Sequence, residues 1–158
     1  MKIVYISGAF LGNGTKANAR EVIKKNIETA KTYAKSLAKN NIGFFLPHIH
    51  SVDIEEKSID QTQRFYYEQD VEFLTRSSDA VLFIPGWQES FGARCERKIA
   101  EELKLPMFFP KNPDDIKEII DWNKTANIDP RDDDKTIDWH KIIDIRRGMA
   151  RAMVPAAA

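Results

Sequence analysis

The sequence predicts an α/β protein with a parallel sheet that is covered by helices on both faces. Three observations support this prediction. Short runs of β-forming residues alternate four times with segments that have the spacing of amphipathic helices. A glycine or proline follows each run, so the strands are short. The segments between the runs are long enough for the crossover helix that parallel pairing requires.

Length and composition bound the class of protein. A chain of 158 residues, with an apolar content of 42% and a charged content of 30%, is ordinary for one globular domain. The net charge is zero, so the composition indicates neither a nucleic-acid polymer nor a membrane surface as a partner. Cys95 is the only cysteine, which excludes an internal disulfide and fits a cytoplasmic protein. We expect no signal peptide, because the first residues enter a strand directly.

The first part of the chain predicts two strands separated by a long helix. Residues 2–7 form the first strand, and Gly8 ends it. The glycine-bearing loop that follows has neither P-loop nor dinucleotide-fingerprint spacing, so it is either a turn or a place where backbone amides approach a phosphate. Residues 17–39 have helical spacing, with lysines on a solvated face. Residues 42–46 form the second strand, which Pro47 stops.

The middle of the chain predicts two further strands and two helices. A polar loop leads to Asp60, which is a suitable cap for a helix that runs to about residue 76. The third strand spans residues 79–84, and the next helix opens near Gly92. The fourth strand spans residues 105–109 and is closed by a proline.

The C-terminal part predicts two helices joined by a polar segment. A capping Asn112, a proline and two acids begin a helix that ends near residue 122. We therefore divide the chain into an α/β domain (1–122), a polar linker (123–135) and a C-terminal helical extension (136–158). The last helix docks either on its own domain or on another subunit. It carries its large apolar side chains on one side, namely Trp139, Ile142, Ile143 and Met149.

Two helices flanking the third strand each carry an acid in the apolar stripe. On the helix that opens near Gly92, the stripe through Ile99 and Leu103 leads back by helical spacing to Glu96. On the preceding helix, Asp70 lies within the stripe. Burying a carboxylate costs free energy unless it is hydrogen-bonded or paired, so two such acids indicate a site. The alternative for Glu96 is a position at the frayed end of the stripe, in contact with water.

Polar and flexible residues stand where the strands end. Parallel α/β sheets bind ligands at the carboxyl ends of their strands, and the residues at these ends are Ser7, Gly8, His48 and Trp87. We regard these four as candidates for substrate contact. His48 is alternatively a structural histidine with a loop hydrogen bond, and Trp87 alternatively covers the sheet edge or a subunit contact. His48 and His50 have no third ligand at a recognised spacing, so we predict neither a metal nor another cofactor.

A pair of acids at the rim of a pocket suits cleavage of a glycosidic bond. One carboxylate attacks or stabilises the anomeric carbon, and the other donates a proton to the leaving group. Tyr5 on the first strand can hold the attacking carboxylate by a hydrogen bond, unless it serves only as core. Ser90 and the amides near Gly92 open a helix, where phosphate binds well, although Ser90 is alternatively only the helix cap. Trp87 or Phe10 can stack on a flat base.

Four short motifs together resemble the nucleoside 2-deoxyribosyltransferase superfamily. They are Tyr5-Ile-Ser-Gly8, Pro47-His48, Tyr67-Glu-Gln-Asp70 and Ser90-Phe-Gly-Ala-Arg-Cys-Glu96. The superfamily includes the 2'-deoxynucleoside 5'-phosphate N-hydrolases and a large branch with a Pro-Gly-Trp loop, and the resemblance covers roughly residues 1–110. It implies a three-layer, flavodoxin- or Rossmann-like domain with four or five parallel strands in the order 2-1-3-4. It also implies a homodimer or a larger homo-oligomer.

The resemblance implies roles for the site residues. The glutamate that matches Glu96 is the nucleophile that takes the deoxyribosyl group, and the aspartate that matches Asp70 assists departure of the base. The tyrosine that matches Tyr5 positions the glutamate. At the position of Ser90, transferases have aspartate and monophosphate hydrolases have serine, so the serine favours a nucleotide substrate. The hydrolases carry an arginine in the first loop where this chain has Leu11, so phosphate must bind other groups.

We therefore expect an enzyme that hydrolyses the N-glycosidic bond of a (deoxy)nucleoside 5'-monophosphate. It would release the base and the sugar phosphate through a glycosyl-glutamate intermediate. The expected ligand is thus a small nucleotide or nucleoside. Two alternatives stand beside this hypothesis: base exchange between nucleosides, and a nucleotide-binding or sensing module without turnover.

Overall fold

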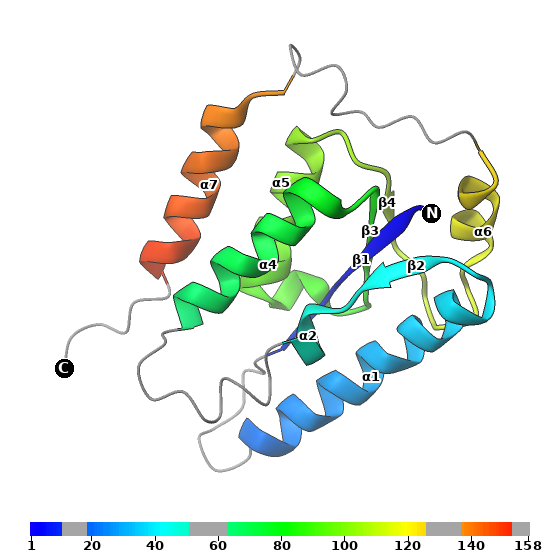
Figure 1. The fold of residues 1–158 in the computed structure, drawn as a ribbon. Coiled ribbons are helices and arrows are strands. Elements are labelled where there is room, and N and C mark those ends of the chain that lie inside the picture. Colours follow the sequence, from blue (N-terminus) through cyan, green and yellow to red (C-terminus); the bar gives the residue numbers. More distant parts are fainter. Residues whose placement is uncertain (11–18, 51–62, 126–136, 153–158) are drawn as a thin grey trace.

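A parallel sheet lies at the centre of the molecule (Figure 1). The computed structural model describes residues 1–10, 19–50, 63–125 and 137–152. Within these ranges, four strands pair in parallel in the order β2-β1-β3-β4, which confirms the predicted topology. The strands are β1 (Ile3–Ser7), β2 (Gly43–Phe45), β3 (Ala80–Phe83) and β4 (Met107–Phe108).

The helices follow the strands in the order that the sequence predicts. The longest helix, α1 (Ala19–Lys39), connects β1 to β2, and α4 (Gln63–Ser77) precedes β3. After a short 3-10 turn, η1 (Trp87–Glu89), helix α5 (Phe91–Glu102) connects β3 to β4. The other helices in the described ranges are α2 (Pro47–His50), α6 (Lys117–Asn123) and α7 (Trp139–Ala152).

Side-chain alternation along the central strands divides the core into two clusters. Val4, Ile6 and Leu82 belong to the cluster on the face that α1 and α6 cover. Tyr5 and Val81, which the register of β1 and β3 aligns, belong to the cluster on the face that α4, α5 and α7 cover. Successive residues of a strand point to opposite faces, so one strand contributes to both clusters. The molecule therefore has the predicted three layers, with the sheet between two layers of helices.

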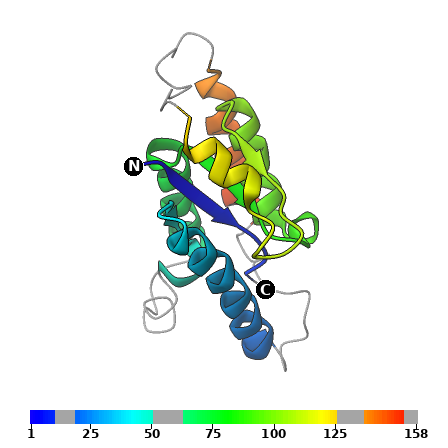
Figure 2. The same cartoon turned by 90° about the vertical axis from the view of Figure 1, so that its right-hand side faces the viewer.

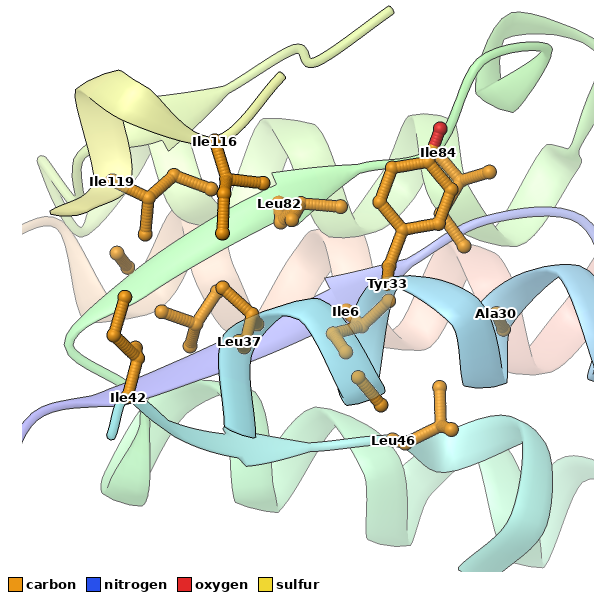
Figure 3. Packing of buried hydrophobic residues seen from close by; sticks show 13 residues of the cluster. Ile6, Ala30, Tyr33, Leu37, Ile42, Leu46, Leu82, Ile84, Ile116 and Ile119 are labelled. Atoms are coloured by element: carbon orange, nitrogen blue, oxygen red, sulfur yellow. The ribbon is translucent and has the colours of Figure 1, made fainter. Parts of the chain in front are cut away.

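The cluster beneath α1 is apolar and tightly buried. Figure 3 shows Ala30, Tyr33 and Leu37 of α1 near Ile6 and Leu82 of the sheet. Ile6, Leu37 and Leu82 have no exposed surface. Burial of each such side chain contributes about 1.5–3 kcal/mol to the free energy of unfolding. This face of the sheet anchors the fold.

Two local predictions differ from the structure. The residues after β2 form the one-turn helix α2 (Pro47–His50) instead of a loop, because proline is favoured in the first turn of a helix. The helix predicted to start at Asn112 begins only at Lys117. The Asn112 side chain instead accepts a hydrogen bond from the backbone N–H of Asp114 at 2.9 Å, which closes a turn. The predicted cap Asp60 and most of the predicted linker lie outside the described residues.

Helix α7 packs on its own domain, against α4 and α5, and lies alongside α5 in both views (Figures 1 and 2). Its buried residues Ile142 and Met149 join the cluster beneath these helices, with Ile145 partly buried beside them. Trp139 and Ile143, predicted on the same side, are each 39% exposed. For Ile143 the reason is helical spacing: positions three and seven after Ile142 share its face, whereas position one does not. Trp139 is the first residue of α7. Among the helices in the described ranges, none combines the length and apolar character that crossing a bilayer requires.

Candidate active site

A buried glutamate lies where α5 packs on the sheet. Glu96 is only 6% exposed, and its helix also buries Ala93, Ile99 and Ala100 on the same side. Helical spacing thus carries the carboxylate inward together with the apolar stripe. The alternative position, at a frayed end in contact with water, does not occur. A carboxylate in such surroundings requires hydrogen bonds to offset the loss of its hydration.

Two hydroxyls of β1 supply these hydrogen bonds. The Tyr5 hydroxyl donates to Oε1 of Glu96 at 2.8 Å, and the Ser7 hydroxyl donates to Oε2 at 2.5 Å. Tyr5 and Ser7 are two residues apart on a strand, so they share one face of the sheet and reach one carboxylate. Both oxygens of Glu96 are therefore bound, and the orientation of the carboxylate is fixed. The sequence predicted the Tyr5 contact, whereas it placed Ser7 among the residues that contact substrate.

The surroundings of Glu96 act on its ionisation in opposite directions. Burial raises the pKa of the Glu96 carboxyl above its ordinary value, while the hydrogen bonds from Ser7 and Tyr5 lower it. The pKa of the Tyr5 phenol is raised well above its ordinary value, first by burial and then by the nearby charges of Glu96 and Asp70. Tyr5 therefore remains protonated at neutral pH. It acts as a permanent hydrogen-bond donor to the carboxylate.

The second predicted acid, Asp70, lies near the same group of side chains. It is half-buried on α4, and its charge raises the pKa of both Tyr5 and Tyr67. Burial is the largest cause of the raised pKa of Tyr67, and the charge of Glu96 is the next. Since the charges of Glu96 and Asp70 act on the same two phenols, the two acids converge on one region, from α5 and α4 respectively. Two-carboxylate chemistry requires both acids near one bond, and this arrangement is compatible with that requirement.

Tyr67 is a member of this region that the sequence named only as the first residue of the Tyr67–Asp70 motif, without a role of its own. A Cβ atom added at Gly92 would lie 1.2 Å from the Tyr67 hydroxyl oxygen, so that hydroxyl rests against the first turn of α5. Tyr67 is three residues before Asp70, which puts both side chains on neighbouring positions of one helix face. That spacing is the signal that identifies Tyr67 from the sequence. Gly92 is needed because any larger residue would overlap with the phenol.

Ser90 and Trp87 make the structural contacts that were weighed as alternatives to substrate binding. The Ser90 side chain accepts a hydrogen bond from the backbone N–H of Ala93 at 3.3 Å and so caps α5. The Trp87 ring packs against Phe83 and Phe109, with ring centroids 5.3 Å and 5.8 Å away. The Arg97 guanidinium lies 5.1 Å from the centre of the Trp87 ring. Trp87 thus covers the sheet beside β4, which is one of the two edge strands of the described sheet.

His48 joins α2 to the segment that follows β1. Its buried ring places Nε2 3.1 Å from the carbonyl oxygen of Ala9, which accepts a hydrogen bond from the Nε2–H tautomer. Burial lowers the pKa of His48 to about 4, so the ring is neutral at pH 7. Gly8, next to Ala9, packs closely on Ile84: an added Cβ would lie 3.2 Å from that side chain. These contacts hold the chain where it leaves β1, close to Ser7.

The possible ligands for a metal do not cluster in the described ranges. No group of three or more histidine, cysteine or acidic side chains gathers there in a way that can hold an ion. Leu11, the position that the resemblance compares with a phosphate-binding arginine, lies outside the described residues. Within the described residues, the group around Glu96 consists of Glu96, Asp70, the phenols of Tyr5 and Tyr67, and the Ser7 hydroxyl.

The residues that build this site fall inside a recognised family. Residues 2–109 match the family described as a domain of unknown function (DUF4406). The chain belongs to this family. The matched segment runs from β1 to the end of β4 and includes Tyr5, Ser7, Tyr67, Asp70 and Glu96, whereas α6 and α7 lie beyond it. A search of curated proteins found no significant match.

Proposed function

We propose that this DUF4406 protein is an N-glycosidase that hydrolyses a (deoxy)nucleoside 5'-monophosphate to a base and a sugar phosphate. The observation that carries the proposal is the fixed carboxylate: Tyr5 and Ser7 bind both oxygens of the buried Glu96. A carboxylate held in this way is pre-oriented for attack on a carbon atom. Pre-orientation of this kind is a major source of rate enhancement in enzymes.

In the first step, an oxygen of Glu96 forms a bond with the anomeric carbon of the sugar. The carbon–nitrogen bond to the base breaks, and its electron pair goes to the base nitrogen. Asp70, in its protonated form, supplies the proton that the leaving base requires. The products of this step are a glycosyl ester on Glu96 and the free base.

In the second step, a water molecule attacks the same anomeric carbon. The ester bond breaks, its electron pair returns to the Glu96 carboxylate, and the water proton passes to Asp70. The sugar phosphate leaves with a new hydroxyl group. Tyr5 assists both steps because its neutral phenol keeps donating to the carboxylate as charge appears and disappears.

The 5'-phosphate is assigned to the N-terminus of α5. Free backbone N–H groups and the helix dipole favour an anion there. Ser90 accepts the capping hydrogen bond with its oxygen, so its hydroxyl proton is available to donate to a phosphate oxygen. The resemblance of the Ser90–Glu96 motif to that of monophosphate hydrolases supports the same assignment. We place the reaction in the cytoplasm, which the single cysteine favours, and assign a homodimer or larger homo-oligomer, as the family resemblance implies.

A chromatographic assay for released base tests the proposal. The wild-type protein is incubated with a panel of ribonucleotides and deoxyribonucleotides, each with and without the 5'-phosphate. We expect release of base from at least one 5'-monophosphate, and loss of that release in the Glu96→Gln variant, which keeps the size of the side chain. No base from any member of the panel would contradict the proposal.

The same assay separates the alternative activities. Addition of a second free base would produce a new nucleoside if the protein exchanges bases. Thermal stabilisation by a nucleotide without any product would instead identify a binding module. Binding without turnover is worth measuring because the Tyr67 hydroxyl lies against Gly92, next to the position proposed for the phosphate. A nucleotide must share this space with the phenol.

A further inference from the structure

Helix α7 lies outside the matched family segment but contacts both helices that carry the acids. From α7, Arg146 pairs with Glu72 of α4, with Nη2 2.5 Å from Oε1. Lys141 of α7 pairs with Glu102 at the end of α5. Glu72 is only two residues after Asp70, so the first ion pair fixes the part of α4 that bears the second acid.

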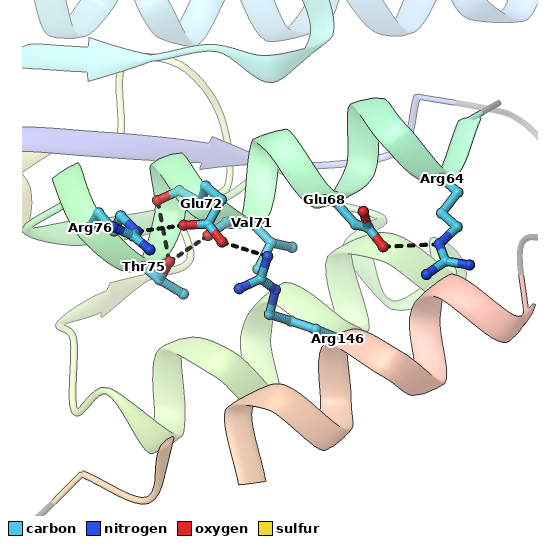
Figure 4. A network of polar contacts seen from close by, with 7 residues as sticks. All are labelled: Arg64, Glu68, Val71, Glu72, Thr75, Arg76 and Arg146. Atoms are coloured by element: carbon cyan, nitrogen blue, oxygen red, sulfur yellow. Dashed lines mark hydrogen bonds and ion pairs between the residues drawn. The ribbon is translucent and has the colours of Figure 1, made fainter. Parts of the chain in front are cut away.

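The ion pairs around α4 are of two kinds, as Figure 4 shows. Arg64 pairs with Glu68, and Arg76 pairs with Glu72, both at a spacing of four residues within α4. Such pairs support the helix itself and do not fix its position. Arg146 is different because it crosses from α7 to α4. Its side chain is only 28% exposed, so solvent screens this pair less than a fully exposed one.

The apolar side of α7 reinforces this cross-link. Ile142 and Met149 are almost fully buried in the cluster that also contains Val71 of α4 and Ile99 of α5. α7 therefore packs on α4 and α5 together, on the side of the two helices away from the sheet. A helix that contacts two others in this way fixes their separation.

Tyr67 connects α7 to the acids. Tyr67 and Val71 of α4 border the same small cavity as Arg146 and Met149 of α7. At its other end, the Tyr67 hydroxyl rests against Gly92 of α5. The phenol thus lies between α7 and the first turn of the helix that carries the nucleophile. Movement of α7 away from α4 would remove the support behind this ring.

We infer that α7 is a positioning element of the site: Arg146 and Met149 hold Tyr67 and the Asp70 segment of α4 against α5. In this way α7 sets the separation of the two acids and keeps water away from the buried carboxylate. The effect on geometry stands on the contacts alone, whereas the effect on catalysis rests on the proposed function. Arg146 and Met149 act through Tyr67 and do not touch the reacting atoms.

Two variants and one matched control test this role in the full chain. Arg146→Met removes the charge that pairs with Glu72, and Met149→Ala removes the side chain behind Tyr67. Arg147→Met is the control, because Arg147 is 68% exposed and its ion pair, at 3.9 Å, stays within α7. Met149→Leu restores an apolar side chain of similar volume, so it should rescue the alanine defect.

The first readout needs no substrate. NMR titration of the Glu96 carboxyl carbon, assigned with Glu96→Gln, follows the pKa of this group. We expect Met149→Ala and Arg146→Met to lower the pKa of Glu96 toward its ordinary value, because water reaches the carboxylate once Tyr67 loses its support. We expect Arg147→Met and Met149→Leu to titrate like the wild type.

The second readout is the rate of base release. We expect kcat to fall about tenfold to a hundredfold in Met149→Ala, with a smaller change in KM, because misplacement of reacting groups slows the chemical step. If the wild type releases no base, the proposed function fails, while the titration still decides the role of α7. If the pKa of Glu96 is the same in Arg146→Met as in the control Arg147→Met, the inference is overturned. Should Met149→Ala fail to fold, the result for Arg146→Met decides.

Discussion

On one face of the sheet, β1 contributes Val4 and Ile6 to a cluster of apolar side chains beneath α1. On the other face, the same strand contributes Tyr5 and Ser7, whose hydroxyls bind Glu96. The period of two along a strand separates the two kinds of residue without any change of backbone. One face can therefore anchor the fold while the other face holds charged groups.

A buried base and a buried acid, His48 and Glu96, lie near the carboxyl ends of the strands. His48 on α2 lies beside α1, and burial lowers the pKa of its ring. Glu96 on α5 lies on the opposite face, and burial raises the pKa of its carboxyl. In both cases burial favours the neutral form, which is the deprotonated form of the histidine and the protonated form of the glutamate. The two groups should therefore respond to pH in opposite directions, and substitutions on the two faces should separate stability from activity.

Glu96→Gln should produce the largest effect on activity. Unlike most substitutions of buried residues, it should not lower the free energy of unfolding. Removal of the proposed nucleophile should lower the rate of base release by about a thousandfold or more. The amide keeps an oxygen for the Tyr5 hydroxyl and offers N–H to the Ser7 oxygen, so both hydrogen bonds have partners. Because the folded-state pKa of Glu96 is raised, wild-type stability falls as pH rises above the ordinary value of 4.5.

Thermal unfolding at several pH values measures this separation. Above pH 4.5, the midpoint for Glu96→Gln should equal or exceed that of the wild type, and the difference should grow with pH. A variant that is both inactive and much less stable at neutral pH would show that Glu96 holds the fold together. The contrast between the two faces would then be wrong.

Leu82→Ala tests the opposite face. Leu82 has no exposed surface and lies in the cluster beneath α1, so its truncation leaves a cavity. We expect a loss of about 2–5 kcal/mol in the free energy of unfolding, measured by urea denaturation. The folded fraction should retain the wild-type kcat, because β3 residues of the other face are unchanged. A large fall in kcat per folded molecule would show that the two faces are coupled.

The contrast between the faces also shows what the sequence can predict. Alternation and helical spacing are local properties, and they predicted the parallel sheet and the place of Glu96 in the apolar stripe of its helix. The strand order came from the family resemblance, and the choice between a buried and a frayed position for Glu96 came only from the structure. The hydrogen bond from Ser7 to Glu96 was not predicted, because spacing does not tell which hydroxyl lies close enough to a carboxylate. The position of the Tyr67 hydroxyl over Gly92 depends on how α4 packs against α5. The packing of one helix against another cannot be derived from the periodicity within either helix.

The regions where prediction was less accurate are those where a local pattern had two readings. The cap residues at Asn112 suit a turn as well as a helix, and the structure forms the turn first. Pro47 stops a strand, but it also favours the start of the short helix α2. On α7, four apolar residues were assigned to one side, although Trp139 and Ile143 lie four residues apart on a more exposed strip. In each case, tertiary contacts choose between conformations that the local sequence allows.

His48→Gln should change the response of stability to acid. The folded-state pKa of His48 is lowered from 6.5 to about 4, so the unfolded chain binds a proton more readily between these values. Stability from this group is therefore present above pH 6.5 and is lost as pH falls toward 4, by about 3 kcal/mol in total. Glutamine keeps an N–H donor for the Ala9 carbonyl but does not titrate.

The free energy of unfolding, measured from pH 7 to pH 4, checks this prediction. As pH falls, the free energy of unfolding should decrease more steeply for the wild type than for His48→Gln. In Glu96→Gln, the opposite contribution of the Glu96 carboxyl, which favours stability at lower pH, should be missing. Parallel curves for the wild type and His48→Gln would mean that His48 does not titrate in this range. The proposed difference between the two buried groups would then rest on Glu96 alone.

Ser7→Ala should have the smallest effect and gives the finest test of the comparison. The substitution leaves Oε2 of Glu96 buried without its donor, which costs about 1–3 kcal/mol while the carboxylate is charged. The hydrogen bond from Ser7 lowers the pKa of Glu96, so its loss should raise that pKa further. The pH range over which stability falls should then extend upward. The acid limb of the rate profile should move to higher pH in the same variant.

A similarly small truncation at a neighbouring position of β1, on the other face of the sheet, gives the matched control. Ile6→Val removes one methylene group from a neighbouring position of β1, at a cost of about 0.5–1.5 kcal/mol that should not depend on pH. Ser7→Ala should therefore recover most of its lost stability on acidification, when Glu96 is neutral, whereas Ile6→Val should not. If both variants lose the same stability at every pH, Ser7 contributes packing alone, and the carboxylate does not depend on its hydroxyl.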